Sequence, residues 1–280
     1  MSDRNRSAAR AQFLPLVLAV ALVLAQIAYP LTAGPARDRV TVLVVLLAAG
    51  TALAHAAVTR GFRYAAGFLV IVSGLGLLSE VVGVALGVPY GCYEYAVDRI
   101  GPGLAGVPVL VPLAWTGGVY PVWIVAGLLT ARAGRLRTPA RIALTAIGAV
   151  GWDLFLDPQM VADDQWTWCD SDSGLPGVPE IPLTNYLGWL VVATVMAALL
   201  AVWEHAAPAP SQPRDEPATV VVPVAVFCWT WLGSALAHAA FLGLPASAGY
   251  GFLGMGVLGV PLLVLLVRDR RTATADRPRR

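Results

Sequence analysis

Residues 64–87 read YAAGFLVIVSGLGLLSEVVGVALG, an apolar run of 24 residues in which Glu80 is the one charged side chain. A helix of about 20 apolar residues spans the hydrocarbon core of a bilayer, so this run predicts a transmembrane helix. Seven comparable runs occur elsewhere in the chain. The sequence therefore predicts an all-α, polytopic integral membrane bundle of about eight transmembrane helices, at residues 13–31, 39–58, 64–87, 104–130, 139–157, 182–203, 218–240 and 249–267.

The overall composition agrees with a membrane protein. Of the 280 residues, 58% are hydrophobic and 13% are charged, whereas about a quarter of the residues of a soluble domain are charged. No polar interval is long enough for a separate soluble domain, so the chain is interpreted as a single membrane domain, 1–280. A bundle of seven helices is the alternative, because only Gly243, Pro245 and Gly249 divide the last apolar stretch into two spans.

The arginines predict the orientation of the bundle. All nineteen basic residues are Arg, and with eight spans sixteen of them lie on one face of the membrane. The other face has Arg37, Arg39 and Arg99. Because basic loops stay in the cytoplasm, both termini are predicted to be cytoplasmic, with basic tails at 1–12 and 268–280. The predicted location is the cell membrane, as a multi-pass protein, and the arginines indicate orientation rather than nucleic-acid binding.

Three acidic residues lie within the apolar runs and are the candidate catalytic groups. Asp153 and Asp157 are four residues apart, so both carboxyl groups lie on one helix face, about 6 Å apart along the axis. Pro158 disfavours helical geometry at the residue before it, which predicts that the helix ends at Asp157. Glu80 lies in the middle of its span, where a charged side chain is expected to face the bundle interior and find a partner.

Other polar residues are interpreted as loop charges or as a substrate site. Four acids of the loop after the fifth span are predicted to be solvated: Asp163, Asp164, Asp170 and Asp172. The segment 88–115 is rich in Gly, Pro and Tyr and is predicted to form a structured cap. Aromatic residues near the cap are either interfacial belt residues or walls of an apolar site. The candidate substrate-binding residues are Tyr93, Glu94, Tyr95, Trp115, Trp152, Gln159, Trp166 and Asn185.

Asn185 lies just inside a span and is expected to form a hydrogen bond with a facing helix. His238 could join the same cluster, although a lone histidine at such a position is more often structural. Gly76, Gly83 and Gly87 predict that the third span packs closely against a neighbour, which would hold Glu80 in place.

The three cysteines do not form a metal-ligand pattern, and no histidine pair has the spacing for one, so no metal site is predicted. Cys92 and Cys169 both fall in loops predicted to face outward. Because that compartment permits disulfides, a bridge is predicted between the cap and the loop after the fifth span. Cys228 is predicted to be a small core residue.

Buried carboxyl groups beside aromatic residues suggest acid-catalysed hydration. A carboxylic acid that keeps its proton can protonate a carbon–carbon double bond, and a neighbouring carboxylate can orient or deprotonate a water. Aromatic rings can stabilise the tertiary carbocation between these steps, and no cofactor is required.

Two other classes of protein could also carry acidic residues within their spans. A membrane prenyltransferase would use the aspartate pair to hold magnesium and a diphosphate, but residues 142–213 contain no Arg or Lys to clamp the phosphates. A transporter or a scaffold of an isoprenoid pathway would use the acids to relay protons or to brace the bundle.

Four ordered motifs between residues 75 and 190 resemble a known family: SEVVGVALGVPYGCYEY, GVPVLVPLAW, WDLFLDPQMV and IPLTNYLGW. This family is the carotenoid biosynthesis family of bisanhydrobacterioruberin and γ-carotene hydratases. The resemblance implies addition of water across the terminal 1,2 double bond of an acyclic C40 or C50 carotenoid. It also implies contacts with membrane lipid and a hydrophobic carotenoid, and an association with other carotenoid pathway enzymes.

Within these motifs the residues that match the family's polar positions are Glu80, Asp153, Asp157, Gln159 and Asn185. We infer Asp153 or Glu80 as the acid and Asp157 as the group that orients the water. The channel for the polyene end is assigned to Tyr93, Tyr95, Trp152 and Trp166. The sequence departs from the family pattern at Cys92 and around 169–179, where the loop is longer and more acidic.

Overall fold

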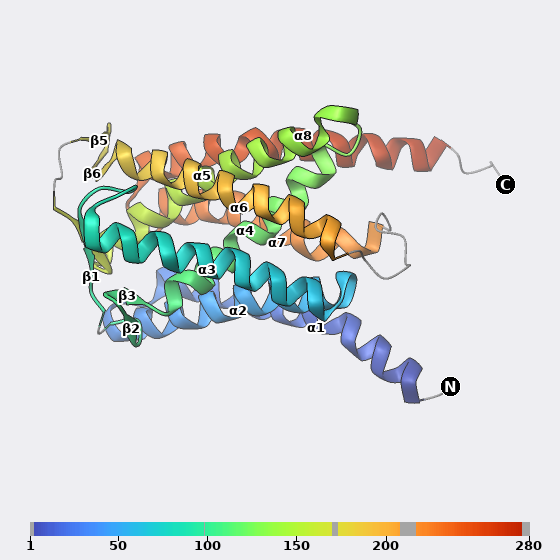
Figure 1. The fold of residues 1–280 in the computed structure, drawn as a ribbon, viewed down its shortest axis with the longest axis horizontal. Helices are drawn as coiled ribbons and strands as arrows, with labels where there is room; N and C mark the ends of the chain where they lie inside the picture. Colours follow the sequence, from blue (N-terminus) through green and yellow to red (C-terminus); the bar gives the residue numbers. More distant parts are fainter. Residues whose placement is uncertain (1–2, 98, 170–172, 208–216, 276–280) are drawn as a thin grey trace.

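The computed structural model describes residues 3–97, 99–169, 173–207 and 217–275. Within them, eight helices are long and apolar enough to cross a membrane, which confirms the all-α membrane bundle of eight helices. The helices lie along one common axis, and both termini lie at the end of the bundle opposite to the short strands (Figure 1). The helices are α1 Asp3–Ala28, α2 Gly34–Arg60, α3 Phe62–Leu86, α4 Leu110–Leu129, α5 Arg137–Ala162, α6 Leu183–Ala206, α7 Pro217–Ala240 and α8 Pro245–Ala275.

Short 3-10 helices and strands connect these helices. The 3-10 helices are η1 Tyr29–Leu31 and η2 Gly134–Leu136, and the strands are β1 Tyr93–Tyr95, β2 Gly103–Leu104, β3 Val107–Pro108, β4 Trp166–Trp168, β5 Gly174–Leu175 and β6 Val178–Pro182.

The α7–α8 connection contains Gly243 with a positive φ of 70°, so the last apolar stretch does form two spans. The seven-helix alternative is therefore wrong. Both termini lie on the same side of the bundle, as an even number of spans requires. That this side faces the cytoplasm stays a prediction.

The fourth span begins later than predicted. Residues 104–109 were assigned to this span, but β2 and β3 form an antiparallel hairpin there and α4 begins at Leu110. The two turn residues, Ala105 and Gly106, have positive φ values of 51° and 83°. This geometry suits the tight two-residue turn of a hairpin, which apolar composition alone does not reveal.

Helix α5 continues past Pro158 to Ala162, so the prediction that it ends at Asp157 is wrong. Proline has no N–H to donate to the carbonyl four residues earlier, which here is that of Leu154. The Ser247 hydroxyl of α8 donates to this carbonyl at 2.7 Å instead. A side chain from a distant helix thus supplies the missing hydrogen bond, and the last turn of α5 keeps Gln159 and Met160 helical.

The glycines of α3 have different roles. A Cβ at Gly76 would lie 3.1 Å from the Trp115 ring, and one at Gly83 would lie 2.5 Å from the Tyr93 hydroxyl, so both glycines permit close packing as predicted. Gly87 was assigned the same role, but it ends the helix in the left-handed conformation with φ of 70°. It is a helix cap, which Gly adopts without a steric penalty.

A small cap covers one end of the bundle. Strand β1 pairs antiparallel with β4, so that Tyr93 lies opposite Trp168 and Tyr95 lies opposite Trp166. The predicted disulfide between Cys92 and Cys169 is confirmed at the end of this strand pair. The cap therefore joins the connection after α3 to the connection after α5.

Removal of this disulfide is expected to destabilise the protein. The bridge joins cysteines 77 residues apart, and its loss frees a long loop in the unfolded chain. We expect the double variant Cys92→Ser/Cys169→Ser to lose about 2–4 kcal/mol and to melt roughly 5–15 °C lower in detergent. Cys228→Ser, which breaks no bridge, is the matched control. Equal melting temperatures for the double variant and the control would contradict this prediction.

A second cluster of charged residues lies near the other end of the bundle. Glu204 of α6 accepts hydrogen bonds from Arg60 at 3.0 Å and from Arg141 at 2.7 Å. The Arg141 guanidinium also lies 3.5 Å from the centre of the Trp123 ring and donates to the Trp123 carbonyl at 3.2 Å. Arg141 lies in α5, and its contacts join α4, α5 and α6.

Candidate active site

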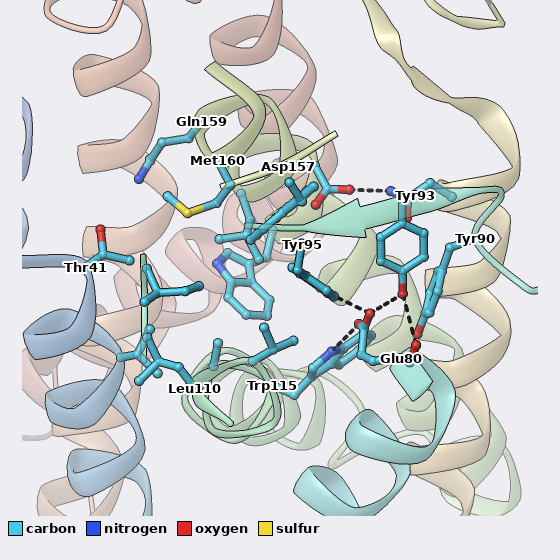
Figure 2. A pocket seen from close by; sticks show the side chains of 18 of the residues that line it. Thr41, Glu80, Tyr90, Tyr93, Tyr95, Leu110, Trp115, Asp157, Gln159 and Met160 are labelled. Carbon is cyan, nitrogen blue, oxygen red and sulfur yellow. Dashed lines mark hydrogen bonds between the residues drawn. The ribbon is translucent and has the colours of Figure 1, made fainter. Parts of the chain in front are cut away.

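A cavity lies beneath the cap, between α2, α3, α4, α5 and α6 (Figure 2). The space between its side chains is about 820 Å³, including the open mouth. Nine of the eleven site residues predicted from the sequence line it: Glu80, Tyr93, Tyr95, Trp115, Trp152, Asp157, Gln159, Trp166 and Asn185. The two that do not are Asp153 and Glu94.

Glu80 is the most extensively hydrogen-bonded carboxyl group of the cavity. Its side chain is buried, and Tyr93 and Tyr95 donate to Oε2 at 2.5 and 2.8 Å. Trp115 Nε1 donates to Oε1 at 3.2 Å. Figure 2 shows these three side chains pointing toward Glu80 from β1 and α4. The prediction that Glu80 faces the interior and finds partners is confirmed.

The two tyrosines are suited to remain hydrogen-bond donors. Burial raises the pKa of the Tyr93 and Tyr95 hydroxyls, and the negative charge of Glu80 raises both further. Donors to a carboxylate stabilise its charged form, so the two hydroxyls oppose the effect of burial, which favours the neutral form of Glu80.

Asp153, Asp157 and Asn185 form a second buried group. The Asn185 side-chain nitrogen donates to Asp153 Oδ2 at 3.0 Å and to one oxygen of Asp157. The predicted hydrogen bond between Asn185 and a facing helix is therefore confirmed. Asp157 lines the cavity, whereas Asp153 has no exposed surface and lies behind the cavity wall. Asp153 Oδ1 has no hydrogen-bond partner among the described residues.

Glu94 is exposed and does not line the cavity, unlike the other residues predicted to bind substrate. Successive side chains of a strand point to opposite faces. Tyr93 and Tyr95 of β1 face the cavity, and Glu94 between them faces outward. The acidic side chain next to the tyrosines therefore has no direct contact with the site.

His238 does not join Asn185. Its Nε2 lies 3.1 Å from Gln159 Oε1, and its Nδ1 lies 2.8 Å from the Ser247 hydroxyl. His238 is buried and thus fixes the side chain of Gln159, one of the polar residues that line the cavity.

Aromatic rings form most of the walls near the carboxyl groups. Trp115 and Trp189 stack with ring centres 3.8 Å apart, and Trp152 meets Trp189 edge-on at 5.6 Å. Tyr95 meets Trp166 edge-on at 5.4 Å. Trp115 and Trp189 are buried within the helix bundle, so these two are not interfacial anchors.

The sequence does not reveal the contribution of η1 and α2 to the cavity. Tyr29, Thr41, Val44 and Val45 line it, yet nothing in the sequence distinguishes them from an interfacial tyrosine and ordinary span residues. The position of the three α2 residues depends on how α2 packs against α4.

Asp163 is not the solvated loop charge that was predicted. It accepts hydrogen bonds from Arg37 at 2.5 Å and from Tyr29, and its backbone carbonyl accepts one from Arg99. Of these residues Tyr29 also lines the cavity, and the contacts involve two of the three arginines predicted for this face. Asp164 is exposed as expected, and the predictions for Asp170 and Asp172 lie outside the described residues.

The fold and the cavity together define a multi-pass helical membrane protein with carboxyl groups in an apolar, aromatic site. Residues 40–263 match the family described as carotenoid biosynthesis protein, and the chain belongs to this family.

The chain is also similar to a curated protein named bisanhydrobacterioruberin hydratase from Haloarcula japonica. The two are 34% identical over 121 residues, which cover 43% of this chain and 39% of that relative. The match thus spans well under half of the length of the relative. No solved structure shows significant similarity to the chain.

Proposed function

We propose that the protein is a carotenoid hydratase that adds water across the terminal 1,2 double bond of an acyclic C40 or C50 carotenoid. The observation that carries this proposal is the presence, in one apolar cavity, of the hydrogen-bonded carboxyl group of Glu80 and of Asp157, one member of the aspartate pair. Family membership and the named relative support a carotenoid as the substrate.

The aspartate pair is assigned as the source of the proton. One amide nitrogen of Asn185 reaches an oxygen of Asp153 and an oxygen of Asp157, so the two carboxyl groups lie close together. Two buried carboxylates at such a separation repel each other, and the pair is expected to share one proton. Asp157 delivers it, because Asp157 lines the cavity and Asp153 does not. This assignment replaces the hypothesis from the sequence in which Asp153 or Glu80 was the acid.

The reaction then proceeds in two steps. Asp157 transfers its proton to the less substituted carbon of the terminal double bond, and the positive charge develops on the tertiary carbon. A water adds its oxygen to that carbon while Glu80 accepts a proton from the water. The product is a tertiary alcohol, and exchange of a proton from Glu80 back to the aspartate pair restores the site.

The aromatic walls stabilise the intermediate cation. Trp152, Trp166 and Tyr95 line the same cavity as the carboxyl groups. A cation over the face of an aromatic ring gains about 0.5–2 kcal/mol, more when water is excluded. The proposed chemistry requires proton transfers and water, and it needs no cofactor.

The proposed location of the protein in the cell follows from its fold. A substrate as apolar as a carotenoid is dissolved in the bilayer, so the protein is placed in the cell membrane in contact with lipid. The proposal includes an association with other enzymes of the carotenoid pathway, which would supply the unsaturated end group.

The proposed function is tested in a bacterial host that accumulates lycopene. We expect expression of the chain to produce pigments heavier than lycopene by one or two waters, detected by chromatography with mass detection. The host without the gene is the control. Protein verified in the membrane that converts neither lycopene nor acyclic C50 carotenoids would refute the proposed function.

A further inference from the structure

A second cavity adjoins the candidate active site at the cap end of the bundle. It encloses about 470 Å³, including its mouth, and lies between α1, α2, α5 and α7. Tyr29, Val44 and Gln159 line both cavities, so the two meet at these side chains. Pro30 and Leu242, which lie in connections between helices, also line the second cavity and place its mouth at the surface of this end.

Several polar side chains line the second cavity, although it lies within a helix bundle. Gln26, Gln159 and Ser234 contribute an amide, a second amide and a hydroxyl to its walls. Gln26 Oε1 is buried and accepts no hydrogen bond from the described residues. A buried water typically makes two to four hydrogen bonds to such groups, so this cavity has the polar partners that ordered water needs.

The cap covers the active-site cavity at this end of the bundle. Strands β1 and β4 lie over the active-site cavity, joined by the Cys92–Cys169 disulfide. Arg99 forms an ion pair with Asp38 at 2.8 Å, and the Gln165 side-chain nitrogen donates a hydrogen bond to Asp38 at 2.7 Å. A hydration consumes one water in each turnover, and an apolar polyene in the main cavity leaves little room for water to pass beside it.

We propose that the cavity lined by Gln26 and Ser234 is the route by which water reaches the active site. This inference rests on the proposed hydratase function. Water enters between the ends of α1 and α7, passes Gln26 and Ser234, and reaches Gln159, where the two cavities meet. The Gln159 side chain at this junction also contacts the buried ring of His238, whose Nε2 lies 3.1 Å from Gln159 Oε1. The polyene and the water thus arrive by separate paths.

The route is tested by cysteine accessibility, which needs no activity. In a Cys228→Ser background, Ser234→Cys is treated with a small charged thiol reagent added from the outer side of sealed membranes. We expect rapid labelling, because a thiol in a water-filled path ionises. The matched control is Thr194→Cys, because Thr194 also carries a hydroxyl but is exposed on the membrane-facing surface of α6. Labelling of Ser234→Cys no faster than that of the control, or only from the inner side, would overturn the proposal.

A second variant tests the route by its effect on turnover. Ser234→Leu should narrow the path and lower the hydration rate at saturating carotenoid by about tenfold or more, with little change in the carotenoid concentration that gives half the maximal rate. Thr194→Leu should have no effect. A wild-type rate in Ser234→Leu would refute the water route while leaving the hydratase function intact. Labelling of Ser234→Cys in a protein that hydrates no carotenoid would refute the proposed function and leave the route standing.

Discussion

The Asp157→Asn variant is expected to lose carotenoid hydration by about 10²–10⁴-fold, the usual contribution of a general acid. The substitution keeps the size of the side chain but removes the carboxyl proton that the mechanism delivers to the double bond. It also keeps an oxygen that can accept the hydrogen bond from Asn185. The rate is measured as pigment converted per amount of protein in isolated membranes.

The control for this variant is Asp164→Asn, which makes the same chemical change at an exposed loop position with positive φ. Asparagine tolerates that backbone conformation, so this variant should keep full activity. Asp153→Asn should lose less activity than Asp157→Asn, because Asp153 does not line the cavity. Full activity in Asp157→Asn, with normal amounts of protein in the membrane, would show that Asp157 is not the acid.

The Arg141→Met variant is expected to give the largest loss of stability. Arg141 donates to Glu204 and to the Trp123 carbonyl, and its guanidinium stacks on the Trp123 ring. Removal of one partner of a buried ion pair costs about 3–5 kcal/mol, and because Glu204 keeps Arg60 as a second partner we expect the loss in Arg141→Met to lie at the lower end of this range. We expect the melting temperature in detergent to fall by roughly 6–20 °C.

Arg135→Met is the control for this effect, because Arg135 is exposed in η2. It should melt within a degree or two of the wild type. The double variant Arg141→Met/Glu204→Met should recover part of the stability lost in Arg141→Met, since it leaves no carboxylate without its main partner. An unchanged melting temperature in Arg141→Met would show that the cluster does not stabilise the bundle.

The sequence predicted the features that depend on local composition. A transmembrane helix must satisfy its backbone hydrogen bonds internally and present apolar side chains to lipid, so each span is visible as an apolar run. A carboxyl group in such a run is costly unless it has a partner, so Glu80, Asp153 and Asp157 could be chosen as site residues from the sequence.

Features that depend on contacts between distant segments were not predictable in the same way. The continuation of α5 through Pro158 needs a hydroxyl from Ser247, which is 89 residues further along the chain. The outward position of Glu94 depends on the pairing of β1 with β4, and the side-chain partners of Asp163 come from η1 and α2. The Arg141–Glu204 ion pair joins residues from different helices and leaves no local pattern in the sequence.

The strand pair β1–β4 also determines when the protein can first act during its synthesis. Tyr93 and Tyr95, which hold Glu80, leave the ribosome well before Trp166 and Cys169, with which their segment must pair. The helices on either side can insert into the membrane while the proposed catalytic centre is still incomplete. Maturation then requires both connections to emerge on the same side and the thiols to be oxidised there. The compartment that receives the cap therefore controls the yield of active protein in any expression host.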